Sequence, residues 1–208
     1  MYKKILFAFL LFIGLQTHAQ STNPNEILIE KVKNFYSWYK TNYTKLDNFI
    51  LYKGNGEYDD PPYKINWKAV EQYFAYIRKN VPALGEAFIT WHRNDFKRID
   101  EDFKLYPTEE IPIGFDYERI VGGQVGVEEV VDYAFPKNGK WKLTINGNTA
   151  MVICTFETLD YETNKMVEAT SKTELKKENG IWKIARTIGM VEADNFFEEE
   201  KKYSSTTI

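Results

Sequence analysis

Three polar side chains in the first part of the chain could transfer protons. His92 is suited to general acid or base work because the pKa of a free imidazole lies near neutrality. Asp116 and Glu118 stand among large apolar side chains, where burial raises the pKa of a carboxyl group. Structural roles compete with this chemistry. His92 would then be bonded to a carbonyl or carboxylate at the core edge, and the carboxylates would cap a turn or pair with Arg119.

Arg186 points to a second kind of site, one that holds a negative charge. If residues 181–188 alternate as a strand, Arg186 shares with Trp182 and Ile184 the face expected to look inward. A buried guanidinium needs an anionic partner because an unpaired buried charge is costly. We expect one of the two carboxylates to be that partner, with a bound ligand as the alternative. A strand that ends earlier would instead leave Arg186 in solvent.

Other catalytic signatures are missing from the sequence. Cys154 lies between apolar neighbours of a predicted strand, without the basic cluster or helix start that activates a thiolate. His92 and the N-terminal His18 are the only histidines, which excludes a multi-histidine metal site. Residues 122–126 lack the Lys-Ser/Thr of a phosphate loop, and residues 54–60 lack the spacing of a calcium loop. We therefore expect no metal, no cofactor and no hydrolase, redox or zinc chemistry.

Three amphipathic helices are predicted ahead of the strands, over residues 26–40, 66–81 and 84–103. Asn66 is suited to cap the second helix, and Pro82 ends it. The glycines, aspartates and prolines of residues 53–62 predict a loop. The apolar stripes of the three helices are Leu28, Val32, Phe35, Tyr36 and Tyr39; Trp67, Val70, Phe74 and Ile77; and Phe88, His92, Phe96, Ile99 and Phe103.

After Gly114 the apolar residues take the period of strands. Residues 141–145, 149–156, 167–176 and 181–188 are predicted strands, joined in part by the Asn-Gly turns at 146–147 and 179–180. In the second of them, Ala150, Val152, Cys154 and Phe156 share one face, and Met151, Ile153 and Thr155 share the other. Helices followed by antiparallel strands indicate an α+β fold. We expect one domain over residues 26–188 whose sheet cups all three helices.

Short motifs in both halves resemble a known superfamily. The closing hairpin, Leu175–Ile184, is similar to the end of nuclear transport factor 2-like domains. Residues 35–39 and 114–118, with Gln124, more closely resemble a secreted bacterial family of that superfamily that is catalogued only as a domain of unknown function. The resemblance implies a cone-shaped fold in which a curved antiparallel sheet wraps around N-terminal helices, and it supplies no activity. Ketosteroid isomerases of the superfamily use a pocket carboxylate, and related domains often pair through the outer sheet face.

The N-terminus is predicted to be a signal peptide. Lys3 and Lys4 precede an apolar run over residues 5–15, and Thr17 and Ala19 fit a signal peptidase site. We expect cleavage after Ala19, with cleavage one residue later or an uncleaved anchor as alternatives. The mature protein would then be periplasmic or secreted, with residues 189–208 as an acidic C-terminal tail.

Composition limits the partners. A length of 208 residues, 43% hydrophobic and 16% aromatic, is typical of one globular domain with a core of large rings. The net charge of −3 and the lack of a basic block argue against a nucleic-acid partner, and no later segment is apolar enough to enter a membrane.

The function that we predict is a non-catalytic binding module for a small molecule or a protein. Its ligand would enter the aromatic-lined open end of the cone and contact Tyr117, Gln124, Trp182 and Arg186. The alternatives are an isomerase- or dehydratase-like enzyme, with Asp116 or Glu118 as base and His92 or Tyr117 as partner, and an inhibitor or immunity-like protein. A homodimer through Met151 and Ile153 is expected, although exposed apolar residues also occur on monomers.

Overall fold

The computed structural model describes residues 23–55, 60–115, 118–122, 126–160 and 163–192. Their fold is α+β, as predicted, with a four-stranded antiparallel sheet and a separate two-stranded sheet. The predicted signal peptide, and residues 193–208 of the predicted tail, lie outside the described residues. Within them, no helix combines the length and the apolar character needed to cross a membrane. The helices are α1 (Pro24–Asn42), α2 (Thr44–Asp47), α3 (Trp67–Asn80), α4 (Glu86–Leu105) and α5 (Val127–Ala134).

The three predicted helices form as their apolar periods require. The α1 helix begins after Asn23, whose side chain accepts a hydrogen bond from the N–H of Asn25. Asn66 caps α3 in the same way, through a hydrogen bond from Ala69 N–H at 3.4 Å. The buried stripes are those expected, except that Trp67 is only half-buried. The short helices α2 and α5 were not predicted.

The loop predicted at residues 53–62 is wrong at residues 53–55 and 60–62, and its middle, residues 56–59, lies outside the described residues. Strands β1 (Tyr52–Asn55) and β2 (Asp60–Ile65) pair there as an antiparallel hairpin, with Tyr52 opposite Ile65. The sequence misleads because β2 contains Pro61 and Pro62, which cannot donate ladder hydrogen bonds. A two-stranded sheet tolerates them because each strand needs backbone partners on one side only.

The four-stranded sheet has the order β3-β4-β5-β6, so each strand pairs with its neighbour in sequence. Its strands are β3 (Lys140–Asn146), β4 (Thr149–Asp160), β5 (Lys165–Glu178) and β6 (Ile181–Glu192). The turn at Asn179-Gly180 occurs as predicted, with φ of 50° and 81°, which suits a tight hairpin. The first hairpin turns one residue later than predicted, at Gly147 and Asn148, because Asn146 still pairs with Thr149. The last strand continues past the predicted domain boundary at residue 188.

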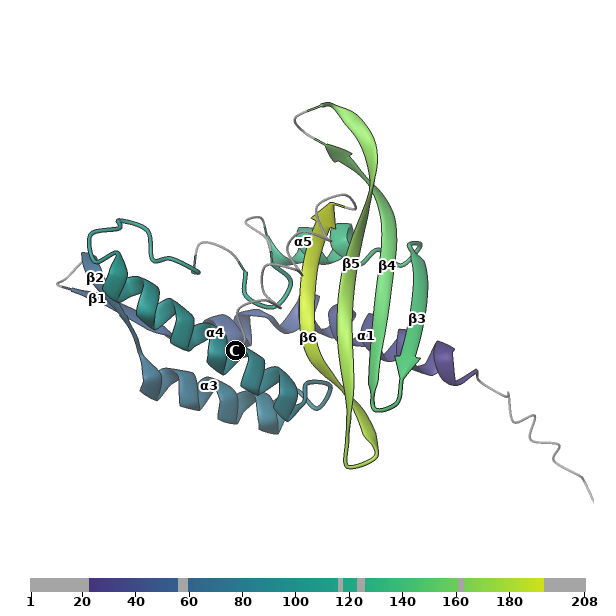
Figure 1. Cartoon of the computed structure of the whole chain (residues 1–208), viewed down its shortest axis with the longest axis horizontal. Helices are drawn as coiled ribbons and strands as arrows, with labels where there is room; N and C mark the ends of the chain where they lie inside the picture. Colours follow the sequence, from purple (N-terminus) through teal and green to yellow (C-terminus); the bar gives the residue numbers. More distant parts are fainter. Residues whose placement is uncertain (1–22, 56–59, 116–117, 123–125, 161–162, 193–208) are drawn as a thin grey trace, which may run out of the picture.

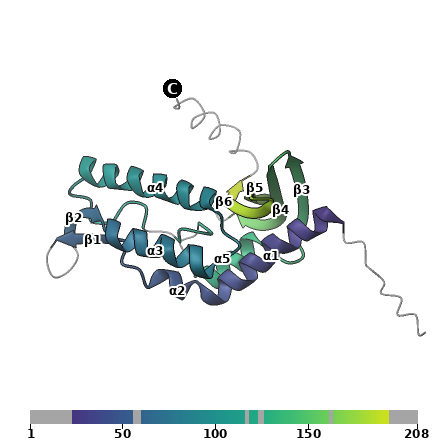
Figure 2. The same cartoon turned by 90° about the horizontal axis from the view of Figure 1, so that it is seen from below.

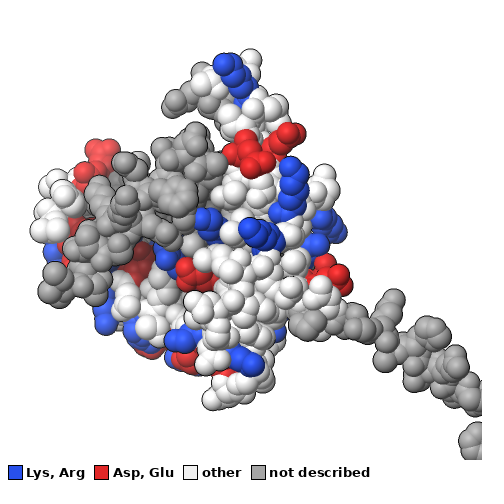
Figure 3. Space-filling view, turned by 45° about the vertical axis from the view of Figure 1, so that its right-hand side comes forward, with Lys and Arg blue, Asp and Glu red and all other residues white. Residues whose placement is uncertain are grey.

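The two faces of β4 divide as the alternation predicts. Ala150, Val152, Cys154 and Phe156 are buried, while Met151 and Ile153 are half-buried on the opposite, outer face. Ile153 lies between Lys142 of β3 and Lys172 of β5 in the register. On this side of the molecule, basic side chains stand beside acidic ones (Figure 3). A homodimer through the outer face stays a prediction.

The helices do not all lie within the sheet. Figures 1 and 2 show α1 and α5 against one face, whereas the α3–α4 pair lies beyond the edge formed by β6. The expectation that the sheet cups all three helices is therefore wrong. Of the three predicted helices, only α1 lies on the inner face, where the Tyr36 hydroxyl and Thr173 Oγ1 are 2.7 Å apart and the Tyr36 ring stacks on Phe135 after α5. One continuous hydrophobic core still joins both parts.

The segment before α4 ties the helical pair to the β6 edge. Ile184 N–H donates to Ala83 O at 2.8 Å, and Gly85 N–H donates to Ile184 O at 3.0 Å. The Glu178 carboxylate then accepts hydrogen bonds from the first N–H groups of α4, at Glu86 and Ala87, each at 3.0 Å. A carboxylate at a helix N-terminus satisfies free donors and opposes the positive end of the helix dipole.

Gly85→Ala is expected to destabilise the protein by about 1–3 kcal/mol, because overpacking forces neighbours to shift. A Cβ at this position would lie 2.5 Å from Glu178 Oε1 and 2.8 Å from Lys183 Cβ. Gly126→Ala is the matched control, since Gly126 is the N-cap of α5 and a Cβ there meets nothing within 4 Å. Urea denaturation measures both. Equal losses in the two variants would show that the contact with Glu178 is not tight.

Candidate functional site

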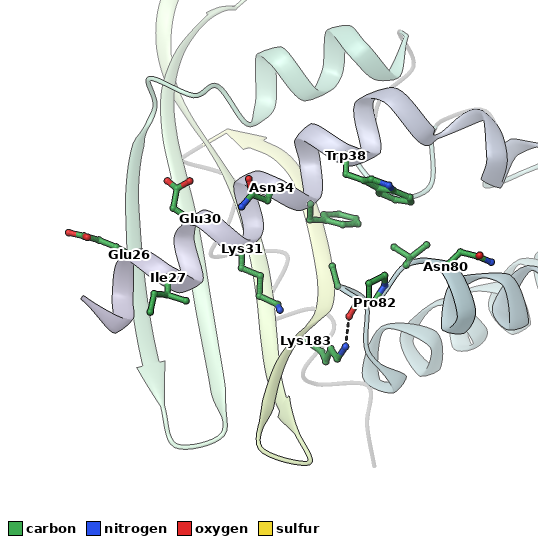
Figure 4. Close-up of a pocket in the computed structure, with 12 residues that line it drawn as sticks. Glu26, Ile27, Glu30, Lys31, Asn34, Trp38, Asn80, Pro82 and Lys183 are labelled. Carbon is green, nitrogen blue, oxygen red and sulfur yellow. Dashed lines mark hydrogen bonds between the residues drawn. The ribbon is translucent and has the colours of Figure 1, made fainter. Parts of the chain in front are cut away.

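A largely apolar groove runs between α1 and the connection from α3 to α4. Its volume is about 820 Å³, within the range of small-molecule pockets. We call it the α1 groove (Figure 4). It is lined by α1 residues Glu26, Ile27, Glu30, Lys31, Asn34, Phe35 and Trp38, by Asn80, Val81, Pro82 and Ala83, and by Lys183 of β6.

The groove exists because α1 carries more apolar surface than the sheet covers. Its buried stripe packs on the inner face, but Ile27 is 52% exposed and Trp38 is half-buried. Opposite them, α3 ends at Asn80, and Val81 and Pro82 lead the chain toward the edge of β6. Two elements distant in sequence thus form opposite walls.

Two lysines place positive charge on one side of this groove. Figure 4 shows Lys31 extending from α1 toward the end of the groove formed by Pro82 and by Lys183 of β6, while Glu26 and Glu30 point away. The Lys183 Nζ donates a hydrogen bond to Pro82 O. Partial burial lowers the pKa of Lys31, and repulsion from Lys183 lowers it further. Neither ammonium has a carboxylate partner among the described residues.

His92 lies where the helical period predicts, but without the partner that a structural role requires. It is 1% exposed, and neither ring nitrogen has a hydrogen bond to a described residue. Its ring stacks on Phe88, with centroids 4.3 Å apart, and contacts the edge of Trp91. Burial lowers the pKa of His92 well below its usual value, and the charge of Arg119 lowers it further. His92 therefore behaves as a neutral aromatic core residue in this structure.

Glu118 is largely occupied by structural hydrogen bonds. The Tyr39 hydroxyl donates to Oε1, and Oε2 accepts from the N–H of Ile120 at 2.8 Å and of Val121 at 2.6 Å. Burial raises the pKa of Glu118, while these hydrogen bonds act in the opposite direction. The arrangement matches the predicted turn cap better than a free general base. The other carboxylate candidate, Asp116, lies outside the described residues.

Arg119 pairs with a residue that the sequence did not indicate. Its Nη2 lies 2.5 Å from Asp95 Oδ2 of α4, its Nη1 donates to Gly114 O at 2.7 Å, and its guanidinium stacks on Phe96 and Phe115. The predicted pairing of Glu118 with Arg119 is therefore not present. The sequence contains no local signal for this pair, because Asp95 belongs to a different element.

The expected inward position of Arg186 is wrong. Ile184 pairs with Leu175 but Arg186 pairs with Glu174, which leaves Ala185 as a bulge that reverses the alternation. Thr187 is buried instead, and the Arg186 side chain is 47% exposed, with Nη1 3.9 Å from Glu174 Oε1. Glu118, one of the two carboxylates expected to pair with Arg186, is bonded elsewhere, and Asp116 lies outside the described residues.

Trp182, Tyr117 and Gln124 are the other residues that were expected to contact a ligand. Trp182 is half-buried against the core, with Lys177 Nζ 5.8 Å from its ring centroid, and it does not line the α1 groove. Tyr117 and Gln124 lie outside the described residues. Burial raises the pKa of the Cys154 thiol to about 12, in agreement with the structural role predicted for it.

Comparison with known proteins returns no matching family model, no matching curated protein and no matching solved structure. The chemistry of the site therefore rests on the geometry of its own residues.

His92→Leu is expected to remove an acid-sensitive part of the stability. The unfolded state takes up a proton as the pH falls below about 6.5, whereas buried His92 does not, so wild-type stability decreases with falling pH until the folded-state pKa is reached. Between about pH 8 and pH 5, the free energy of unfolding of the wild type should fall by about 2 kcal/mol more than that of the variant. Urea denaturation at each pH measures this difference. Parallel curves for the two proteins would contradict a buried neutral histidine.

Proposed function

We propose that the protein is an exported, non-catalytic binding module that holds a small amphipathic anion in the α1 groove. The observation that carries the proposal is the combination of a largely apolar groove of about 820 Å³ with two lysines, Lys31 and Lys183, that line the same end of it and repel each other. The ligand class that fits is a carboxylate or phosphate ester with an aliphatic or aromatic body.

The apolar walls supply the affinity of such a ligand. Ile27, Phe35, Trp38, Val81 and Pro82 contribute apolar surface to the groove. Each Å² of apolar surface removed from water stabilises the complex by about 25 cal/mol. The stacked rings of Phe35 and Trp38, with centroids 6.4 Å apart, form a firm wall that needs little ordering when a ligand arrives.

The two lysines make the groove selective for an anionic ligand over a neutral one. An anionic head group between Lys31 and Lys183 would relieve their mutual repulsion and accept charge-assisted hydrogen bonds. Glu30 does not compete for this position, because it pairs with Lys33 at 3.0 Å. A neutral ligand would leave the repulsion between the ammonium groups in place.

The same proposal includes a nuclear transport factor 2-like fold and an exported location for the protein. Helices that precede a four-stranded antiparallel sheet are compatible with a nuclear transport factor 2-like cone, although the groove lies outside the sheet's inner face. Export follows from the signal-peptide pattern of residues 1–19. An exported carrier or sensor of amphipathic anions is the role that combines these features.

Decanoate is expected to bind the purified protein, and decanol, which has the same chain without the charge, is expected to bind at least tenfold more weakly. Lys31→Met and Lys183→Met should each weaken decanoate binding about tenfold, since a hydrogen bond to a charged group contributes about 1.5–3 kcal/mol. Lys79→Met, at an exposed position of α3, is the matched control. Isothermal titration calorimetry measures all four proteins.

A second variant tests the apolar wall. Ile27→Glu places a carboxylate in the groove at a position that is 52% exposed, so the fold should remain intact while decanoate binding is lost. Equal affinity for decanoate and decanol would reject the role of the lysines. A protein that binds neither compound would reject the proposed site.

A further inference from the structure

A second, smaller cavity lies at the other end of α1, with a volume of about 340 Å³. We call it the Glu118 cavity. Five aromatic side chains line it: Tyr39, Phe49, Tyr52, Tyr73 and Phe115. Phe49, Tyr52 and Phe115 are only half-buried, as expected for rings that border open space. Aromatic faces carry negative electrostatic potential and attract cations.

Two carboxylates complete the wall. Glu118 and Asp47 both line the cavity, and neither forms an ion pair with a described residue. Burial raises the pKa of Glu118, and repulsion from Asp47 raises it further. Partial burial also raises the pKa of Asp47, although its position is exposed. Both groups would be stabilised as anions by a positive charge placed between them.

One positive side chain already lies at the cavity, but it does not neutralise Asp47 or Glu118. Arg119 also lines it, but the guanidinium is engaged by Asp95 at 2.5 Å and by Gly114 O, and it is stacked on Phe96 and Phe115. Its charge is therefore balanced by Asp95 rather than by Glu118.

Tyr73 gives an independent sign that a polar ligand is accommodated. The side chain is 2% exposed and lines the cavity, and its hydroxyl forms no hydrogen bond with a described residue. The hydroxyl oxygen is not among the fully buried polar atoms that lack a partner, so it borders the open space of the cavity. A bound ligand with a hydroxyl or N–H group would give it a hydrogen-bond partner.

We propose that the Glu118 cavity binds a small organic ammonium ion, with the aromatic rings around the cationic group and Asp47 and Glu118 as its counter-charges. The site is separate from the α1 groove and takes a ligand of opposite charge. Its volume suits a head group of the size of trimethylammonium with a short polar substituent.

Choline is the probe for this site, and isothermal titration calorimetry at low ionic strength is the measurement. Saturable binding is expected for choline, and none for its carbon analogue, in which a tert-butyl group replaces the trimethylammonium group. Asp47→Asn, at an exposed position, should weaken choline binding about threefold to fivefold. Phe49→Leu keeps the apolar bulk and removes one ring, and should weaken it about fivefold.

Two controls separate this site from the α1 groove. Glu129→Gln, at an exposed position of α5, and Lys31→Met should both leave choline binding unchanged. Failure of choline to saturate the protein, or equal binding of the carbon analogue, would overturn the proposal without affecting the decanoate experiment. A loss in Lys31→Met equal to that in Asp47→Asn would place the cation elsewhere and overturn it as well.

Discussion

The contact of residues 83–85 with the β6 edge determines how the two parts of the molecule fit together. An edge strand leaves a row of backbone N–H and C=O groups without partners, which other chains can pair with. Here Ile184 gives one N–H and one C=O to Ala83 and Gly85, and Glu178 at the end of β5 caps the helix that follows. The start of α4 is thereby fixed to the sheet. Because Pro82, Ala83 and Lys183 all belong to this junction, one wall of the α1 groove depends on it.

Much of the fold could be predicted because its elements carry strong local signals. The helices α1, α3 and α4 each have a long apolar stripe, and Asn66 marks one helix start by a side-chain cap. The main sheet is indicated by alternating apolar residues and by the turn residues of its first and last hairpins, although a bulge interrupts the alternation in β6. The β1–β2 hairpin was missed because its prolines suggest a loop, and only its position at the surface makes them acceptable in a strand. The packing of α3 and α4 depends on tertiary contacts that no local period specifies.

The site residues were harder to predict, for two physical reasons. A bulge of one residue at Ala185 moves Arg186 to the outer face, and an alternating pattern contains no sign of such a shift. The lysines of the α1 groove come from positions 31 and 183, so only the complete fold brings them together. For His92, the position could be predicted but the surroundings could not. Its place on the stripe was predicted, but its lack of a hydrogen-bond partner depends on which rings surround it.

The two cavities share α1, which raises the question of whether their ligands influence each other. Phe35 borders the α1 groove and Tyr39, one turn later, borders the Glu118 cavity, with ring centroids 5.9 Å apart. Coupling between sites requires an element with two arrangements that the ligands can select. Phe35 is 3% exposed and Tyr39 is 1% exposed, and the Tyr39 hydroxyl is bonded to Glu118. Close-packed interiors leave such rings little space to move. The wall between the sites is therefore rigid, and an anion in the groove and a cation in the cavity should bind independently.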